Sequence, residues 1–330
     1  MRILSSITSK LREEVESVLD KTFEVEELEK GLNTIYLLSS EDEKFILKVH
    51  TNPKNKAQWF RAEPEIYERI SQELNIPSPN ILYKDLSCES YQNMFYVMEA
   101  MEGENPEKIK KELSQENLEQ ILYWYGEILG KIHEISLSDG YGILGREDCG
   151  IVADSEQWNW CLEGAMSAWK SDAEDGWEEP PEIEYDEEKV KEILPDKPEP
   201  ALVHSDNRLD NILIQGNQIT AFLDWSHSWS AHRYYDLARA EYLLIDHDLS
   251  YKTPKSKQKL REKLFDGYRQ NQEIREDWMK SDIRKTYRYA NTLWLAAGFG
   301  NWGAKLSEKE REETREDILK RMDAEKPEFL

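Results

Sequence analysis

The chain has 330 residues, with 43 lysines and arginines against 67 aspartates and glutamates, so its formal net charge at pH 7 is −24. A polyanion of this size repels nucleic-acid backbones and anionic lipid head groups, which argues against a nucleic-acid partner and a membrane surface. The longest uncharged stretch, residues 289–304, contains polar residues and is too short to cross a bilayer, so we expect it to form a buried helix. Three cysteines without paired spacing, and charges close behind the apolar N-terminus, predict a cytoplasmic protein without disulfides or a secretion signal. The spread of negative charge over the whole chain also suggests a surface adapted to high salt.

The first hundred residues have the pattern of a small sheet with helices. An apolar stripe at helical spacing predicts an amphipathic helix through Leu11, Val15, Val18 and Leu19. Runs rich in β-branched and aromatic residues then predict a three-stranded meander over residues 23–28, 33–38 and 45–50. A second helix is expected through Trp59 and Leu74, followed by strands near residues 81–83 and 94–98. The five strands would close a small sheet near residue 98.

From about residue 103 the pattern changes to long helical periodicity. One buried helical face is expected from Leu118, Ile121, Leu122, Tyr125, Ile128, Leu129 and Ile132. A single β interruption is predicted, because residues 212–214 and 219–223 flank Gly216-Asn217, a hairpin signal. The second part of the chain is therefore expected to be mainly helical.

Polar residues with catalytic potential gather at the ends of this predicted hairpin. Residues 204–211 read His-Ser-Asp-Asn-Arg-Leu-Asp-Asn and run directly into the first strand, and the second strand ends in Asp224. Depending on where the turn is centred, Asn211 lies opposite Asp224 or, one register away, opposite Phe222. In both registers a carboxamide and a carboxylate share one end of the ribbon.

These two side chains suit a magnesium ion. Mg²⁺ takes one or two oxygen ligands from a protein and completes its octahedral shell with water and phosphate oxygens. Asp206, five residues before Asn211, is then available to accept a proton from a hydroxyl. A base next to a metal ion that binds phosphate is the smallest set of groups that phosphoryl transfer requires.

The loop resembles the catalytic loop of the aminoglycoside phosphotransferase family, which has a protein-kinase-like fold. That family has His-Gly-Asp, then an asparagine before an apolar strand, and later Asp-Trp or Asp-Phe; here the positions are His204, Asp206, Asn211 and Asp224. The resemblance implies that Asp206 is the catalytic base and that Asn211 and Asp224 are the metal ligands. It also implies that His204 is a structural residue of the loop.

Residues 45–49, Phe-Ile-Leu-Lys-Val, are similar to the family's strand that carries the phosphate-binding lysine, which makes Lys48 the candidate. Glu63 is the family-like partner of Lys48, but Pro64 follows it, and a proline inside a helix costs about 3 kcal/mol. We therefore expect the main helix to begin at Glu63 or to bend there, and Glu65 remains an alternative partner.

Further segments resemble the family's nucleotide site. Residues 31–34 look like its short nucleotide loop, which implies contacts from Gly31 and Asn33. Residues 95–103 resemble the strand and linker whose backbone pairs with the adenine edge, which implies contacts from Glu99 and Met101. Asp236 matches the residue that holds the catalytic-loop backbone by accepting amide hydrogens.

Two other positions depart from the family pattern. Ser205 replaces the usual glycine, so its backbone must adopt an angle that a residue with a side chain tolerates. Ser226 stands where glutamate is common, and we expect this change to alter substrate contacts and not the metal.

Together these observations predict an α+β, bilobal protein-kinase-like fold. Its parts would be a small antiparallel-sheet N-terminal lobe over residues 1–98, a hinge over 99–103 and a mainly helical C-terminal lobe over 104–330. The implied activity is transfer of the γ-phosphoryl group of ATP or GTP, with Mg²⁺, to a hydroxyl of a small molecule. The alternative is a non-catalytic nucleotide or small-molecule binding protein on the same fold.

The acceptor stays open among aminoglycosides, amino alcohols, sugars and amino acids, as does the oligomeric state. Residues 172–188 contain ten acidic residues and no basic one, and tryptophans surround this segment. The segment could bind a cationic acceptor, or it could be a solvated acidic loop. A third possibility is a hydrolase with a metal held by His227, His232 and His247 together with His204 and Asp206. It is disfavoured because the spacing of the histidines matches no ligand pair on a helix or strand.

Overall fold

The computed structural model of the chain describes residues 8–31, 33–51, 57–147, 150–153, 164–165, 167–171, 177, 187–194 and 197–328. The chain forms two compact units. The first unit comprises Met1–Leu113, Leu144–Val152 and Leu209–Ser228, and the second comprises Ser114–Ile143, Ala153–Arg208 and Trp229–Leu330. None of the helices in the described ranges is both long and apolar enough to span a membrane.

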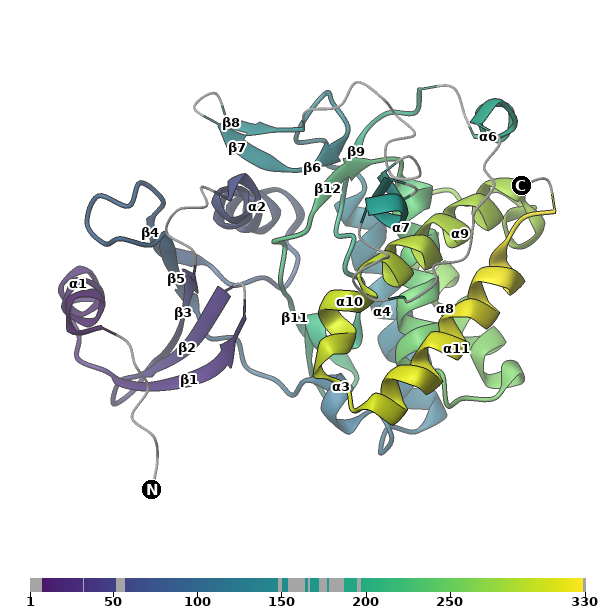
Figure 1. Cartoon of the computed structure of the whole chain (residues 1–330). Helices are drawn as coiled ribbons and strands as arrows, with labels where there is room; N and C mark the ends of the chain where they lie inside the picture. Colours follow the sequence, from purple (N-terminus) through teal and green to yellow (C-terminus); the bar gives the residue numbers. More distant parts are fainter. Residues whose placement is uncertain are drawn as a thin grey trace. The chain divides into compact units, whose positions relative to one another are not determined.

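The first unit contains the predicted five-stranded sheet. Its strands are β1 (Glu24–Lys30), β2 (Asn33–Ser39), β3 (Lys44–His50), β4 (Ile81–Asp85) and β5 (Phe95–Glu99). They pair antiparallel in the order β1-β2-β3-β5-β4, so the three-stranded meander is confirmed and β3 is central (Figure 1). The alternation of β2 and β3 buries Leu38, Leu47 and Val49 in one apolar cluster.

Helix α1 (Ser9–Leu19) covers part of this cluster, as the apolar stripe predicts. Leu11 and Val15 are buried, but Val18 is 39% exposed, so the buried stripe of this helix is narrower than predicted. The helix ends at Asp20, which adopts the left-handed conformation of a helix cap.

Helix α2 (Gln58–Leu74) begins five residues earlier than predicted and contains Pro64 in its interior. The start at Glu63, one of the two expected arrangements, is therefore wrong, while the expected bend there remains a prediction. Pro64 removes one backbone hydrogen bond at a cost of about 3 kcal/mol. The fully buried side chains of Phe60, Ile66 and Ile70 each contribute about 1.5–3 kcal/mol, which outweighs that cost.

The first unit also contains segments from farther along the chain. They are α3 (Pro106–Ile109), the hairpin β7 (Gly145–Glu147) and β8 (Gly150–Val152), the 3-10 turn η1 (Leu209–Asn211), and the hairpin β10 (Ile212–Gln215) and β11 (Gln218–Phe222). The β10–β11 hairpin is the predicted one. The lobe boundary at residue 98 and the hinge at 99–103 remain predictions.

The second unit is mainly helical, as expected. Its longer described helices are α4 (Gln115–Ile132), α6 (Glu187–Ile193), α7 (Arg233–Ala240), the π-helix η2 (Glu241–Asp248), α8 (Pro254–Tyr268), α9 (Asp282–Ala297) and α11 (Glu308–Glu325). The short ones are η3 (Trp278–Lys280), α10 (Phe299–Trp302) and η4 (Gly303–Lys305). The uncharged stretch is thus divided at Gly298 between α9 and α10. All seven residues of the predicted α4 face are buried.

Helices α4 and α8 approach closely because each contributes a glycine to the contact. A Cβ atom at Gly126 or Gly267 would overlap the backbone of the other helix. The pair forms the centre of the second unit.

The prediction of one β interruption is wrong. Besides β7–β8, a three-stranded sheet in the second unit joins β6 (Gly142–Ile143), β12 (Trp229–Ala231) and β9 (Ala201–Val203) in that order. Strands of two or three residues are too short to show an alternating pattern. The α+β class, with an antiparallel sheet in the N-terminal region and a helical C-terminal region, is confirmed.

Candidate active site

Lys48 lies in the middle of the central strand β3, between Ile35 on β2 and Tyr96 on β5. Its side chain is only 5% exposed, and its ammonium group contacts both carboxylate oxygens of Glu63 at 2.8 and 2.9 Å. Glu63 is fully buried on α2. The structure thus pairs Lys48 with Glu63, the first of the two partners considered.

The same ammonium group lies 3.0 Å from Oδ1 of Asp224, two residues after the end of β11. Lys48 therefore bridges a carboxylate on α2 and a carboxylate at the end of the hairpin. Three hydrogen bonds from one ammonium use all of its donors. Lys48, Glu63 and Asp224 thus form one cluster of paired charges in the first unit.

The charges in this cluster stabilise one another. Desolvation lowers the pKa of Lys48, but Asp224 and Glu63 more than offset it and raise that pKa above its ordinary value. Desolvation opposes the ionisation of Asp224, yet Lys48 and a hydrogen bond from Ser226 hold the pKa of Asp224 well below its usual range. Lys48 is therefore a cation and Asp224 an anion at neutral pH.

Asn211 lies at the same end of the hairpin as Asp224, but in neither predicted register. The turn is at Gly216-Asn217, with Gln215 opposite Gln218, and a bulge after Leu213 shifts the pairing by one residue. As a result the carbonyl of Asn211 accepts a hydrogen bond from the amide of Leu223, at 2.8 Å. Asn211 thus pairs with the residue next to Asp224.

Asn211 and Asp224 offer an amide oxygen and a carboxylate oxygen, the donor types that Mg²⁺ takes from proteins. Among the described residues no group of three or more His, Cys, Asp or Glu side chains could hold a metal. A site with two protein donors leaves the remaining positions of the metal to water and phosphate oxygens, which is the usual way Mg²⁺ is held beside nucleotides. Since the described residues contain no such group of three, the structure also gives no support to the metal site considered for His227, His232 and His247.

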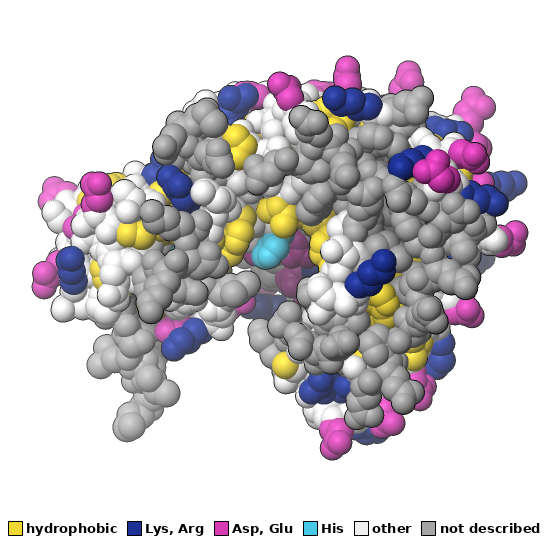
Figure 2. Space-filling view, turned by 45° about the horizontal axis from the view of Figure 1, so that its top comes forward, with side chains coloured by type: hydrophobic (Ala, Val, Ile, Leu, Met, Phe, Trp, Pro, Cys, Tyr) yellow, Lys and Arg dark blue, Asp and Glu magenta, His cyan; other side chains and the backbone are white. Residues whose placement is uncertain are grey.

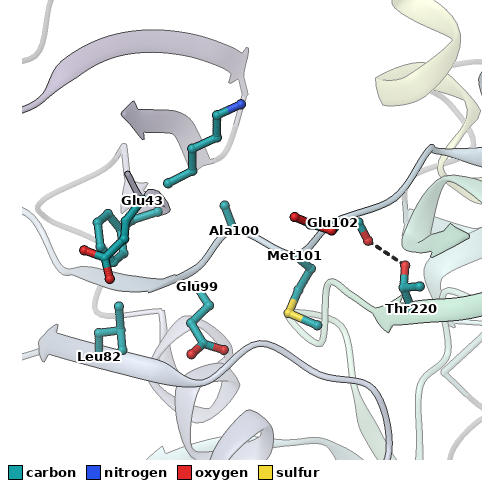
Figure 3. A pocket seen from close by; sticks show the side chains of 9 residues that line it. Glu43, Leu82, Glu99, Ala100, Met101, Glu102 and Thr220 are labelled. Carbon is teal, nitrogen blue, oxygen red and sulfur yellow. Dashed lines mark hydrogen bonds between the residues drawn. The ribbon is translucent and has the colours of Figure 1, made fainter. Parts of the chain in front are cut away.

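The linker after β5 borders an open pocket. It is lined by Glu43, Lys44, Phe45, Leu82, Glu99, Ala100, Met101, Glu102 and Thr220. Figure 3 shows Glu43, Leu82 and Glu99 on one side of this pocket and Met101 and Thr220 on the other. Neither the backbone N–H nor the carbonyl of Met101 bonds to another described residue, so both could pair with a ligand.

The other predicted nucleotide contacts have partners of their own. The carboxylate of Glu99 accepts hydrogen bonds from the amide and side chain of Asn80. Gly31 and Asn33 lie at the β1–β2 turn, where the amide of Gly31 bonds to the carbonyl of Asn33. The Asn33 side chain lies 3.2 Å from the ring of His50. Leu32, also in this loop, is outside the described residues.

In the second unit, Asp236 at the start of α7 is completely buried and holds the 204–207 loop. Its oxygens accept the backbone amides of His204 and Ser205 at 3.0 and 3.1 Å and the side-chain amide of Asn207 at 2.5 Å. Burial opposes ionisation, but the ring of His133 and then the contacts with His204 lower the pKa of Asp236. The carboxylate therefore stays charged.

The loop held by Asp236 carries Asp206. The ring of His204 accepts the amide of Asp206 at 3.3 Å, and Ser205 adopts a left-handed backbone with φ of 60°. Glycine is favoured in this conformation, which explains why the resemblance leads one to expect glycine at this position. The chain passes from the second unit to the first directly after this loop, between Arg208 and Leu209.

Sequence reasoning missed two contacts of Asp224. Its backbone amide donates to the hydroxyl of Tyr67 at 2.9 Å, and its Oδ1 accepts from the hydroxyl of Ser226 at 2.6 Å. The only signal in the sequence is the spacing of Tyr67 four residues after Glu63, which places both on one face of α2. The acidic tract is almost entirely outside the described residues.

Comparison with known proteins identifies the family. A family model described as the phosphotransferase enzyme family matches residues 24–272. A search of curated proteins finds no match. A thermostable mutant of the aminoglycoside phosphotransferase APH(4)-Ia has a similar structure, at 15% identity over 95% of this chain and 97% of that chain, with a TM-score of 0.61.

Two further solved structures show the same fold. One is a putative aminoglycoside phosphotransferase from Ralstonia eutropha, at 15% identity over 97% of this chain and 95% of that chain, with a TM-score of 0.62. The other is a putative fructosamine-3-kinase from Haemophilus somnus, at 15% identity over 94% and 96% of the two chains, with a TM-score of 0.59. Since the family model covers most of the chain, this protein belongs to the phosphotransferase enzyme family of the aminoglycoside phosphotransferase type.

Proposed function

We propose that this protein transfers the γ-phosphoryl group of ATP or GTP to a hydroxyl group of a small molecule. The observation that carries the proposal is the buried Lys48, held between Glu63 and Asp224. A lysine fixed by a helix carboxylate and adjacent to a metal-ligand carboxylate is the arrangement that binds nucleotide phosphates in kinase-like enzymes.

Each proposed residue has a defined role. Lys48 binds the nucleotide phosphates, and the backbone of Met101 pairs with the base. Asn211 and Asp224 hold Mg²⁺, which supplies neutralisation of the charge on the phosphates. Asp206 orients the acceptor hydroxyl and accepts its proton while the hydroxyl oxygen bonds to the γ-phosphorus and the bond to the nucleoside diphosphate breaks.

The relatives support a nucleotide and a polyhydroxylated acceptor. One solved structure of an APH(4)-Ia mutant is a ternary complex with AMP-PNP and hygromycin B, and an APH(2")-IIa structure is a ternary complex with streptomycin and ATP. For this chain we propose a hydroxyl acceptor that carries positive charge, because its net charge of −24 attracts cations.

A panel of hydroxyl-bearing acceptors tests the proposal. Nucleoside diphosphate release is followed with Mg²⁺ and ATP or GTP, in dilute buffer and in molar KCl, with aminoglycosides, amino alcohols, sugars and hydroxy amino acids. We expect at least one acceptor to stimulate turnover and to carry a new phosphate ester by ³¹P NMR. Nucleotide binding without stimulation by any acceptor would favour the non-catalytic binding protein.

A further inference from the structure

Asp224 has a strained backbone, and two hydroxyl groups contact this residue, one at the backbone amide and one at the carboxylate. Its φ angle is 58°, in the left-handed region, which costs about 1–3 kcal/mol for a residue other than glycine. Such a conformation persists only where the surroundings stabilise it. The hydroxyl of Tyr67 bonds to the backbone amide of Asp224 and the hydroxyl of Ser226 bonds to its carboxylate, and these two residues are only 1% and 3% exposed.

Tyr67 connects Asp224 to the helix that also supplies Glu63. The two residues are one turn apart on α2, so both face the same side of the helix. Glu63 binds Lys48, and the hydroxyl of Tyr67 accepts the amide hydrogen of Asp224 at 2.9 Å. The position of α2 therefore controls both the lysine and the backbone of the proposed metal ligand.

Ser226 selects which carboxylate oxygen of Asp224 stays available. Its hydroxyl donates to Oδ1 at 2.6 Å, the same oxygen that Lys48 contacts at 3.0 Å. No hydrogen bond joins Oδ2 to any residue within the described ranges, and the side chain of Asp224 is 42% exposed. His227 Nδ1 lies 3.1 Å from the Ser226 oxygen, and in the tautomer with its hydrogen on Nδ1 the ring orients that hydroxyl by donating to it.

We propose that Tyr67 and Ser226 are positioning residues that hold Asp224 so that Oδ2 faces the divalent ion. The inference rests on the proposed function, because it assigns a task to the carboxylate only if the site binds a metal-bound nucleotide. It explains how a serine can stand where the family commonly has glutamate. The serine orients the metal ligand and does not act as a second carboxylate.

The test separates metal-dependent from metal-independent nucleotide binding. The dissociation constant of AMP-PNP is measured by calorimetry in excess Mg²⁺ and in excess EDTA for the wild type, Tyr67→Phe, Ser226→Ala and Ser226→Thr. Tyr287→Phe is the matched control, because it removes a buried hydroxyl that bonds His232 at 2.8 Å, in the second unit. Loss of one hydrogen bond to Asp224 is expected to reduce the gain in affinity from Mg²⁺ by about three- to tenfold.

The expected pattern is specific. In Tyr67→Phe and in Ser226→Ala, Mg²⁺ increases the affinity for AMP-PNP less than in the wild type, while the dissociation constant in EDTA stays within about twofold of the wild-type value. In Ser226→Thr and in Tyr287→Phe, Mg²⁺ increases the affinity as much as in the wild type. Equal gains in all variants would overturn the inference while leaving the proposed function intact. A wild type that binds AMP-PNP in neither condition would instead refute the proposed function.

Discussion

The ammonium nitrogen of Lys48 lies 3.0 Å from Oδ1 of Asp224, although 176 positions separate the two residues in the sequence. This contact joins the central strand of the small sheet to the end of the β10–β11 hairpin within one compact unit. Glu63 completes the group, so one buried cation is shared by two carboxylates. Removing Lys48 leaves two carboxylates without their shared cation, and this property makes the cluster testable through stability as well as activity.

Lys48→Met is expected to lower the free energy of unfolding by about 3 kcal/mol at neutral pH, because Glu63 is then buried without a cation. The loss should shrink as the pH falls, since the unpaired Glu63 then takes up a proton. The double variant Lys48→Met with Glu63→Gln should recover most of the stability. Guanidinium unfolding at pH 5 and pH 7 measures both effects.

The control is Lys84→Met, which breaks the pair of Lys84 with Glu68 in the same unit. Both side chains of that pair are about one third exposed, at 34% and 35%, so its loss should cost less than about 1 kcal/mol. A similar loss in both variants would show that burial of the Lys48 cluster carries no special cost.

His232 should make the protein less stable in mild acid. Burial, together with Arg233 and His133, lowers the pKa of His232 to about 3. Its pKa in the unfolded chain is about 6.5, so between these values only the unfolded state gains the proton, and stability falls as the pH drops through this window. The slope from this one group is about 1.4 kcal/mol per pH unit.

His232→Gln removes that proton-binding group. Urea unfolding of both proteins at several pH values between 4 and 7 measures the slopes. The variant should lose less stability than the wild type as the pH falls. Parallel curves would contradict a neutral buried His232.

Gly103→Ala should destabilise the first unit by about 2 kcal/mol or more. Gly103 has a φ angle of 139°, and a Cβ atom there would lie 2.6 Å from the hydroxyl of Thr220 and 3.0 Å from the carbonyl of Ile214. Gly31→Ala is the matched control, because among the described residues a Cβ atom at Gly31 would meet only the carbonyl of Asn33, at 4.0 Å. Thermal unfolding should separate the two variants, and equal midpoints would refute the steric argument.

Salt should stabilise the protein. With a net charge of −24, repulsion between carboxylates opposes folding, and ions screen that repulsion. Acidic and basic side chains are interspersed over the face shown in Figure 2, so the described part of this face carries no single acidic patch. The unfolding temperature should rise by about 3 °C or more between 0.05 and 0.5 M KCl, where screening changes most. An unchanged midpoint would rule out the high-salt interpretation.

Long periodic segments and the order of motifs could be read from the sequence. The five-stranded sheet, the buried face of α4 and the approach of Asn211 toward the end of the hairpin follow from patterns of several residues each. The start of α2 could not be read, because the cost of Pro64 is visible in the sequence while the packing that offsets it is not. Tertiary contacts decide such cases.

The remaining errors have related causes. A bulge after Leu213 adds one residue to one strand and leaves no sequence signal, so the pairing of Asn211 fell between the two expected registers. The contacts of Tyr67 and Ser226 with Asp224 depend on how distant segments meet. The roles of Asp206, Asn211 and Lys48 remain proposals that activity measurements must test.

The central claim is that this chain is a phosphotransferase in which Asp206 accepts the proton of an acceptor hydroxyl. The most direct test measures acceptor-stimulated turnover and Mg²⁺–AMP-PNP binding in the same preparation of Asp206→Ala. We predict that turnover falls by about 100-fold or more, while the nucleotide dissociation constant changes less than about threefold. An Asp206→Ala protein that keeps wild-type turnover would contradict the account.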